Sequence, residues 1–221
     1  MNAVRYNKGS MRPLNSFLDG CRDFIRRIMH RLALGLNSTT GGKLTPNTVT
    51  IAGLLAHIPI AYLIAVHQNF WAAGLLVVFG LFDTLDGELA RLQKRAGPAG
   101  MLLDATTDRF KEVLLYCGAA YSFVSLGKPH MAVWAVAACG ASICVSYVKA
   151  KGETAVAGGK LSANEVNRLF QDGLLRFEVR MFLLVVGLLA DKVIIAVIVI
   201  AVMSTYTAFE RLIKISRKLL Q

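Results

Sequence analysis

Long apolar runs alternate with short polar breaks along most of this chain. A helix needs about 20 predominantly apolar residues to cross a bilayer, and most of the runs reach that length. They predict an all-α protein, a bundle of six transmembrane helices. The predicted spans cover residues 47–67, 70–91, 100–126, 131–149, 177–190 and 193–209. The fifth run is the shortest and also fits a helix that packs partly in the membrane interface.

The segment at residues 14–36 has a different pattern. Apolar residues recur there at i, i+3 and i+4 spacing, and much of the remainder is arginine: Arg22, Arg26, Arg27 and Arg31. An apolar stripe beside an arginine-rich face is typical of an amphipathic helix lying in the membrane interface. Packing of the stripe against other protein is the alternative. We therefore predict an N-terminal cytoplasmic, interfacial segment over residues 1–43 and a six-span domain over residues 44–221.

The composition supports a multi-pass membrane protein. Hydrophobic residues make up 55% of the chain, and the mean hydropathy is +0.51. The net charge is nevertheless +11, and the lysines and arginines gather on one side of the predicted topology. The positive-inside rule makes this side cytoplasmic, facing anionic membrane lipids, and places both termini there. Repeated apolar spans argue against nucleic-acid binding, the other common explanation of a basic chain.

Four aspartates interrupt the apolar pattern: Asp83, Asp86, Asp104 and Asp108. A carboxylate within a bilayer costs roughly 2.5–3.5 kcal/mol even on the lenient insertion scale. The first two are three residues apart and the last two are four apart, so each pair shares a helix face. An antiparallel hairpin of the second and third spans would bring the pairs together. Carboxylate oxygens suit Mg²⁺, and four of them can hold two ions that assist displacement at phosphorus.

Three residues near the aspartates fit a phosphate site. Gly87 and Gly100 remove side chains where a ligand could approach the backbone, although glycine in a helix costs about 0.5–1 kcal/mol relative to alanine. Arg91 could counter phosphate charge or pair with an aspartate. The alternative is that the acidic pairs are ordinary salt-bridge partners or solvated helix ends.

The spacing D-x2-D-G-x2-A-R-x8-G-x3-D-x3-D holds in this chain at every fixed position. It resembles the signature of the CDP-alcohol phosphotransferase family, and the six-span layout with its interfacial helix is similar too. The resemblance implies an integral membrane homodimer that joins a CDP-linked lipid or alcohol to an acceptor alcohol and releases CMP.

The resemblance also implies roles for the fixed residues. Asp83, Asp86 and Asp104 would hold the metal ions, Mg²⁺ with Mn²⁺ as the alternative. Asp108 would be a further ligand and the general base for the acceptor hydroxyl. The nucleotide-binding residues would be Asp83, Gly87, Ala90, Arg91 and Gly100.

The acceptor site is indicated by a second stretch. SYVKAKGE, residues 146–153, resembles a stretch of phosphatidylinositol-phosphate and archaetidylinositol-phosphate synthases. By this resemblance Lys149, Arg176 and Arg180 would bind the acceptor phosphate. The sequence GLLRFEVR departs from the GLLERxER-like pattern expected of these synthases, because Arg176 stands where a glutamate often does. The alternative for all three cations is that they anchor the chain on the cytoplasmic side of the membrane.

We therefore predict a phospholipid-biosynthesis enzyme of the cell membrane with its site open to the cytoplasm. It would transfer a phosphatidyl-type group from a CDP-diacylglycerol-like donor to a soluble polyol phosphate, with inositol phosphate favoured. Synthesis of phosphatidylglycerophosphate from glycerol 3-phosphate is the alternative within the class. A divalent-cation transporter is the alternative from another class, but the third span becomes apolar beyond Asp108. The diacyl or ether nature of the donor stays open.

Overall fold

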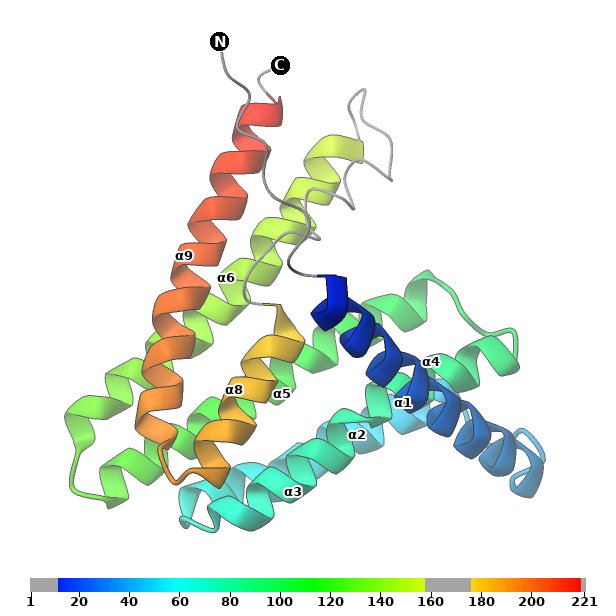
Figure 1. The fold of residues 1–221 in the computed structure, drawn as a ribbon, viewed down its shortest axis with the longest axis horizontal. Helices are drawn as coiled ribbons and strands as arrows, with labels where there is room; N and C mark the ends of the chain where they lie inside the picture. The colour runs from blue at the N-terminus through cyan, green and yellow to red at the C-terminus, as the bar shows by residue number, and fades with distance from the viewer. Residues whose placement is uncertain (1–11, 158–175, 220–221) are drawn as a thin grey trace. The chain divides into compact units, whose positions relative to one another are not determined.

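The computed structural model describes residues 12–157 and 176–219, and every regular element in these ranges is a helix. Figure 1 shows their course along the chain. The elements are α1 (Arg12–Thr39), α2 (Pro46–Ala65), α3 (Asn69–Gly80), α4 (Phe82–Leu92), α5 (Pro98–Ser125), η1 (Pro129–Met131), α6 (Ala132–Ala157), α8 (Phe177–Leu189) and α9 (Val193–Leu219). The all-α prediction is confirmed for the described residues. The middle of the basic stretch between α6 and α8, residues 158–175, lies outside them.

Four helical stretches among the described residues are long and apolar enough to cross a membrane. They are Pro46–Ala65, Asn69–Leu92, Pro129–Ala155 and Val193–Arg217. They match the first, second, fourth and sixth predicted spans. The third predicted span is α5, whose first 15 residues include five charged ones, and the fifth is α8, which has only 13 residues.

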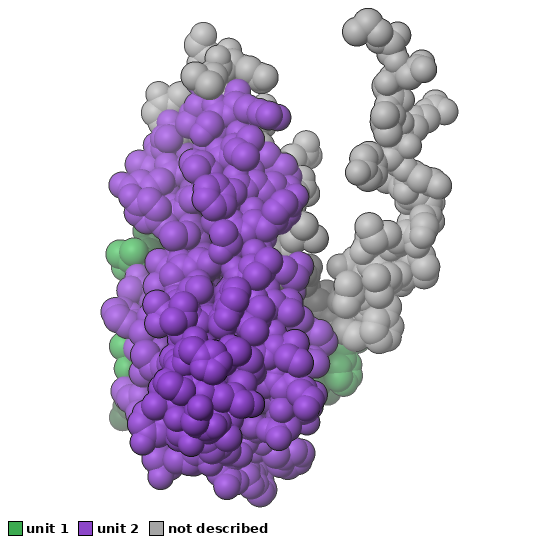
Figure 2. All heavy atoms as spheres, turned by 90° about the vertical axis from the view of Figure 1, so that its left-hand side faces the viewer, with its two compact units in different colours: residues 1–53, 80–104 green, residues 54–79, 105–221 purple. Residues whose placement is uncertain are grey.

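The chain divides into two compact units, which are coloured separately in Figure 2. The first unit comprises residues 1–53 and 80–104, and the second comprises residues 54–79 and 105–221. In the first unit α1 packs against α4. Its small core consists of Met29, Ala33, Val49, Leu85 and Leu89.

The second unit holds the larger apolar core. There α9 packs along α6 and against α8, as Figure 1 shows. The centre of the core contains Leu115, Phe123, Leu184 and Ile200, each at most 1% exposed. Gly118 of α5 faces the backbone of α2 so closely that a Cβ there would collide with the carbonyl group of Ala61. A side chain at position 118 would therefore force these helices apart.

The second predicted span is two helices in the structure. The α-helical pattern lapses at Leu81, between α3 and α4. Leu81 keeps right-handed helical angles, φ −77° and ψ −14°, and its carbonyl oxygen still accepts from the amides of Thr84 and Leu85. The lapse follows Gly80, and glycine weakens a helix because it leaves the backbone unrestrained. The motif therefore begins on a helix of its own, α4.

A tight turn closes α4 and leads into α5. The amide of Arg95 donates to the carbonyl oxygen of Ala90 at 2.9 Å, and Lys94 adopts a positive φ of 54°. This is the left-handed residue that commonly ends a helix. Pro98 then occupies the first position of α5, where proline is favoured because that position needs no amide hydrogen. The turn thus joins the two helices that carry the aspartates.

Candidate functional site

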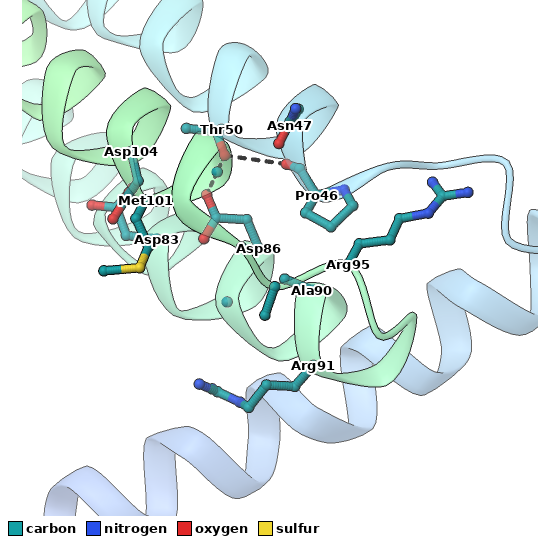
Figure 3. Close-up of a pocket in the computed structure, with 14 residues that line it drawn as sticks. Pro46, Asn47, Thr50, Asp83, Asp86, Ala90, Arg91, Arg95, Met101 and Asp104 are labelled. Carbon is teal, nitrogen blue, oxygen red and sulfur yellow. Dashed lines mark hydrogen bonds between the residues drawn. The ribbon is translucent and has the colours of Figure 1, made fainter.

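The first unit contains a cavity of about 240 Å³ at the motif (Figure 3). Its walls come from the start of α2, from α4, from the turn after it and from the first turns of α5. Seven of the eight fixed motif residues line it: Asp83, Asp86, Gly87, Ala90, Arg91, Gly100 and Asp104. The remaining lining residues are Pro46, Asn47, Thr50, Arg95, Ala96, Gly97 and Met101. The hairpin of α4 and α5 therefore gathers seven of the eight motif residues around one cavity.

Asp86 is the most buried aspartate of the motif, at 6% exposure. The Thr50 hydroxyl donates to Asp86 Oδ2 at 2.5 Å, and it also lies 3.1 Å from the Pro46 carbonyl oxygen. Figure 3 shows both contacts at the edge of the cavity. A short bond to a carboxylate is strong because the acceptor is charged. Thr50 thus fixes the Asp86 side chain, a role that no motif position indicates.

Asp83 and Asp104 meet across the cavity from α4 and α5. A carboxylate oxygen of one lies within 4.8 Å of a carboxylate oxygen of the other. Asp108 follows one turn later on α5, in the second unit. Two like charges at this spacing favour a shared cation. An oxygen-only donor set of this kind suits a hard divalent ion such as Mg²⁺ or Mn²⁺.

The two motif glycines border open space. A Cβ on Gly87 would lie 3.8 Å from Arg91 Nη2, and one on Gly100 would lie 4.0 Å from Asn47 Oδ1. Both are ordinary van der Waals distances. The protein itself therefore tolerates a methyl group at either position, and a steric requirement for glycine would come from a bound ligand.

Arg91 is held by a glutamate rather than by the aspartates. Its Nη2 donates to Glu88 Oε1 at 2.5 Å, and the same carboxylate binds Arg26 and His30 of α1. Figure 3 shows the Arg91 side chain extending from α4 on the side of α1. Glu88 is not among the residues that the sequence predicts for the site, because the family spacing leaves that position free.

Asp108 lies in the second unit beside two cations of its own helix. Lys111 Nζ is 3.1 Å from Asp108 Oδ1, and Arg109 Nη2 is 3.9 Å from Asp108 Oδ2. The Lys111 side chain is only 1% exposed. A buried ammonium group needs a close acceptor, so Lys111 and Asp108 stabilise each other. Neither cation was singled out from the sequence, although both lie within three residues of Asp108.

The three predicted acceptor residues belong to the second unit and differ in exposure. Lys149 on α6 is exposed and lies 3.8 Å from Glu153. Arg176 is exposed and precedes α8. Arg180 is 1% exposed, and its Nε and Nη2 bind Glu112 at 2.7 and 3.1 Å. Two of the three are thus exposed, while the third is buried against a carboxylate.

Comparison with known proteins identifies the family. The model of the CDP-alcohol phosphatidyltransferase family matches residues 43–207. The chain belongs to this family. The membership was predicted from the spacing of the motif, and it is confirmed. Together with the four long apolar helices, it identifies the chain as an integral membrane protein.

The similar curated proteins are inositol-lipid synthases. The phosphatidylinositol phosphate synthase of Corynebacterium glutamicum is 39% identical over 115 residues, which are 50% of this chain and 52% of that protein. The archaetidylinositol phosphate synthase of Pyrococcus horikoshii is 28% identical over 177 residues, covering 80% of this chain and 86% of the relative. The chain spans about half the length of the bacterial relative that it matches.

A solved structure supports the fold over a larger share of the chain than the bacterial relative matches. The phosphatidylinositol phosphate synthase of Mycobacterium tuberculosis with CDP-DAG bound superposes with a TM-score of 0.72 and 26% identity. The superposition covers 86% of this chain and 94% of that one. The same mycobacterial protein has also been solved with manganese and citrate, and that structure gives a TM-score of 0.71 at 24% identity.

Proposed function

We propose that this protein transfers a phosphatidyl-type group from a CDP-activated lipid to inositol phosphate and releases CMP. The observation that carries the proposal is the single cavity lined by seven fixed motif residues, with Asp108 on the next turn of α5. The names of the inositol-lipid synthases and the CDP-DAG bound to the mycobacterial one support the choice of donor and acceptor.

In this proposal Asp83, Asp86, Asp104 and Asp108 hold two divalent cations, Mg²⁺ or Mn²⁺. Bound there, the cations would neutralise the donor diphosphate and the departing CMP. Thr50 keeps Asp86 oriented toward the cavity. Gly87, Ala90 and Gly100 leave room for the cytidine, and Asp83 and Arg91 support the nucleotide.

Asp108 acts as the general base. The inositol phosphate hydroxyl attacks the donor phosphorus that bears the lipid, and its proton passes to Asp108 as the oxygen–phosphorus bond forms. The bond from that phosphorus to the CMP oxygen breaks, and CMP leaves. Lys111 and Arg109, at 3.1 and 3.9 Å, hold the Asp108 carboxylate in one orientation.

For the acceptor, Lys149, Arg176 and Arg180 would bind the phosphate of inositol phosphate. The exposure of Lys149 and Arg176 supports this proposal. Arg180 would share its charge between that phosphate and Glu112, to which two of its nitrogens already bind.

We further propose six spans, both termini and the site on the cytoplasmic side, and a homodimer. The division into an interfacial segment, residues 1–43, and a membrane domain, residues 44–221, is supported by the family match beginning at residue 43. The exposed apolar residues Phe24, Ile25, Ile28 and Leu32 of α1 support its location in the membrane interface.

The test is a CMP-release assay of the purified protein in mixed micelles with CDP-diacylglycerol. Inositol phosphate, glycerol 3-phosphate, inositol and serine are compared as acceptors, with Mg²⁺, with Mn²⁺ and with a chelator. We expect release with inositol phosphate, and none after chelation. Preference for glycerol 3-phosphate would overturn the acceptor, and the absence of release with every acceptor would overturn the reaction.

A further inference from the structure

We propose that Glu88 is a positioning residue for the nucleotide end of the site, because it orients Arg91 and connects that arginine to α1. The inference rests on the proposed function, in which Arg91 supports the nucleotide. Glu88 occupies a position that the motif leaves free, between Gly87 and Ala90. Its role therefore follows from contacts rather than from the spacing.

The Glu88 carboxylate binds three cationic or imidazole groups. Arg91 Nη2 lies 2.5 Å from Oε1 and Arg26 Nε lies 2.9 Å from the same oxygen. His30 Nδ1 lies 3.2 Å from Oε2. Both oxygens are therefore engaged, and the carboxylate can keep all three contacts in only one orientation. Charge-assisted bonds of this kind are stronger than neutral ones and more directional.

The partners come from two helices. Glu88 and Arg91 are one turn apart on α4, whereas Arg26 and His30 are one turn apart on α1. The α1 pair thus fixes the carboxylate, and the carboxylate fixes Arg91. Without Glu88, the long Arg91 side chain would regain several rotamers, and binding of a nucleotide would have to restrict them again.

The exposed fractions of the side chains explain why the cluster orients Arg91 but adds little to the stability of the fold. The Glu88 side chain is 7% exposed, but the side chains of Arg26, His30 and Arg91 are 56%, 51% and 52% exposed. Water can solvate these three groups when Glu88 is neutralised. Among the described residues, Arg91 Nε and Nη1 have no protein acceptor, so two nitrogens remain for a ligand.

The experiment compares Glu88→Gln, Arg91→Gln and the double variant in the CMP-release assay. We expect Glu88→Gln to raise the KM for CDP-diacylglycerol about fivefold, while kcat and the KM for inositol phosphate change less than about twofold. The double variant should bind the donor no worse than Arg91→Gln alone, because Glu88 acts through Arg91. The inference would be overturned if the rise in donor KM of the double variant equalled the product of the two single rises. An unchanged donor KM in Glu88→Gln would also overturn it.

Two further variants keep the test decisive. Arg26→Gln removes one partner of Glu88 and leaves the glutamate in place, so the donor KM should rise about twofold even if Glu88→Gln fails to fold. Arg31→Gln is the matched control, because Arg31 borders the same surface of α1 but is not among the described residues that bond or ion-pair with Glu88. Equal effects of Arg26→Gln and Arg31→Gln would overturn the inference. A wild-type protein without CMP release would instead overturn the proposed function.

Discussion

Two glutamates, one in each unit, each bind several basic side chains, and the two resulting ion clusters differ in their exposure to solvent. The Glu88 cluster comprises Glu88 with Arg26, His30 and Arg91, and all three partners are about half exposed. The Glu112 cluster comprises Glu112 with Arg109 and Arg180, whose side chains are 0%, 21% and 1% exposed. Arg109 also lies over the ring of Phe177, 5.0 Å from its centroid. The first cluster is open to its surroundings and the second is closed.

The difference in exposure predicts a difference in purpose. A charge left alone in a closed cluster has no water to replace its partner, so the fold depends on every member. In an open cluster, a cation that loses its partner returns to solvent at little cost. We therefore expect the Glu112 cluster to control stability and the Glu88 cluster to control the position of Arg91.

The largest expected effect is the loss of turnover on changing Asp108, which lies beside Arg109 of the Glu112 cluster. Asp108→Asn keeps the shape of the side chain but removes the base, so kcat should fall about 10²- to 10⁴-fold. The affinity for CDP-diacylglycerol should change little. The protein should stay folded in detergent, because the asparagine carbonyl oxygen can still accept from buried Lys111. Retained turnover would remove Asp108 as the base. Loss of the folded protein would place Asp108 within the stabilising cluster itself.

Neutralising Glu112 tests the closed cluster directly. Glu112→Gln leaves Arg180 buried with its charge uncompensated, which costs about 3–5 kcal/mol of unfolding free energy. Thermal unfolding in detergent should show a loss of many degrees. Glu112→Gln combined with Arg180→Met removes the charge as well and should recover much of the loss. An unchanged midpoint in the single variant would contradict the contrast between the clusters.

Packing in the second unit offers a comparison without charge. Gly118→Ala would place a methyl group against the Ala61 carbonyl and should cost about 1–3 kcal/mol. Gly140→Ala on α6 is the matched control, because nothing lies within 4 Å of its Cβ position. That change should leave stability equal or raise it by up to about 1 kcal/mol. Equal effects of the two substitutions on the thermal midpoint would show that the close approach contributes nothing.

The smallest expected effect on stability is in the open cluster. Glu88→Gln should lower the unfolding free energy by less than about 1 kcal/mol, since its partners are solvated. The thermal midpoint, measured beside Glu112→Gln under the same conditions, checks this. A loss as large as that of Glu112→Gln would show that the Glu88 cluster is closed to water in the membrane.

Much of the fold was predictable because a helix is specified by residues that are close together in the sequence. The predicted first span, residues 47–67, differs by two residues or fewer from α2, and the predicted third and fifth spans end within one residue of α5 and α8. The lapse at Leu81 was missed, since an apolar run that continues through it carries no signal for the interruption. The predicted ends of α6 and α9 fell short, because both helices continue beyond the apolar run into polar residues.

The sequence by itself determined the family and the motif residues that line the candidate cavity. Residues three or four apart in a helix lie on the same face, so the spacing of the carboxylates and glycines predicts which of them lie together. This periodicity can be recognised over only a few residues. The tertiary structure alone decided the partners. Thr50 and Asp86 are 36 residues apart in the chain, Arg26 and Glu88 are 62 apart, and Glu112 and Arg180 are 68 apart. Contacts at such separations leave no local pattern, and the exposure of each partner exists only after the helices have packed.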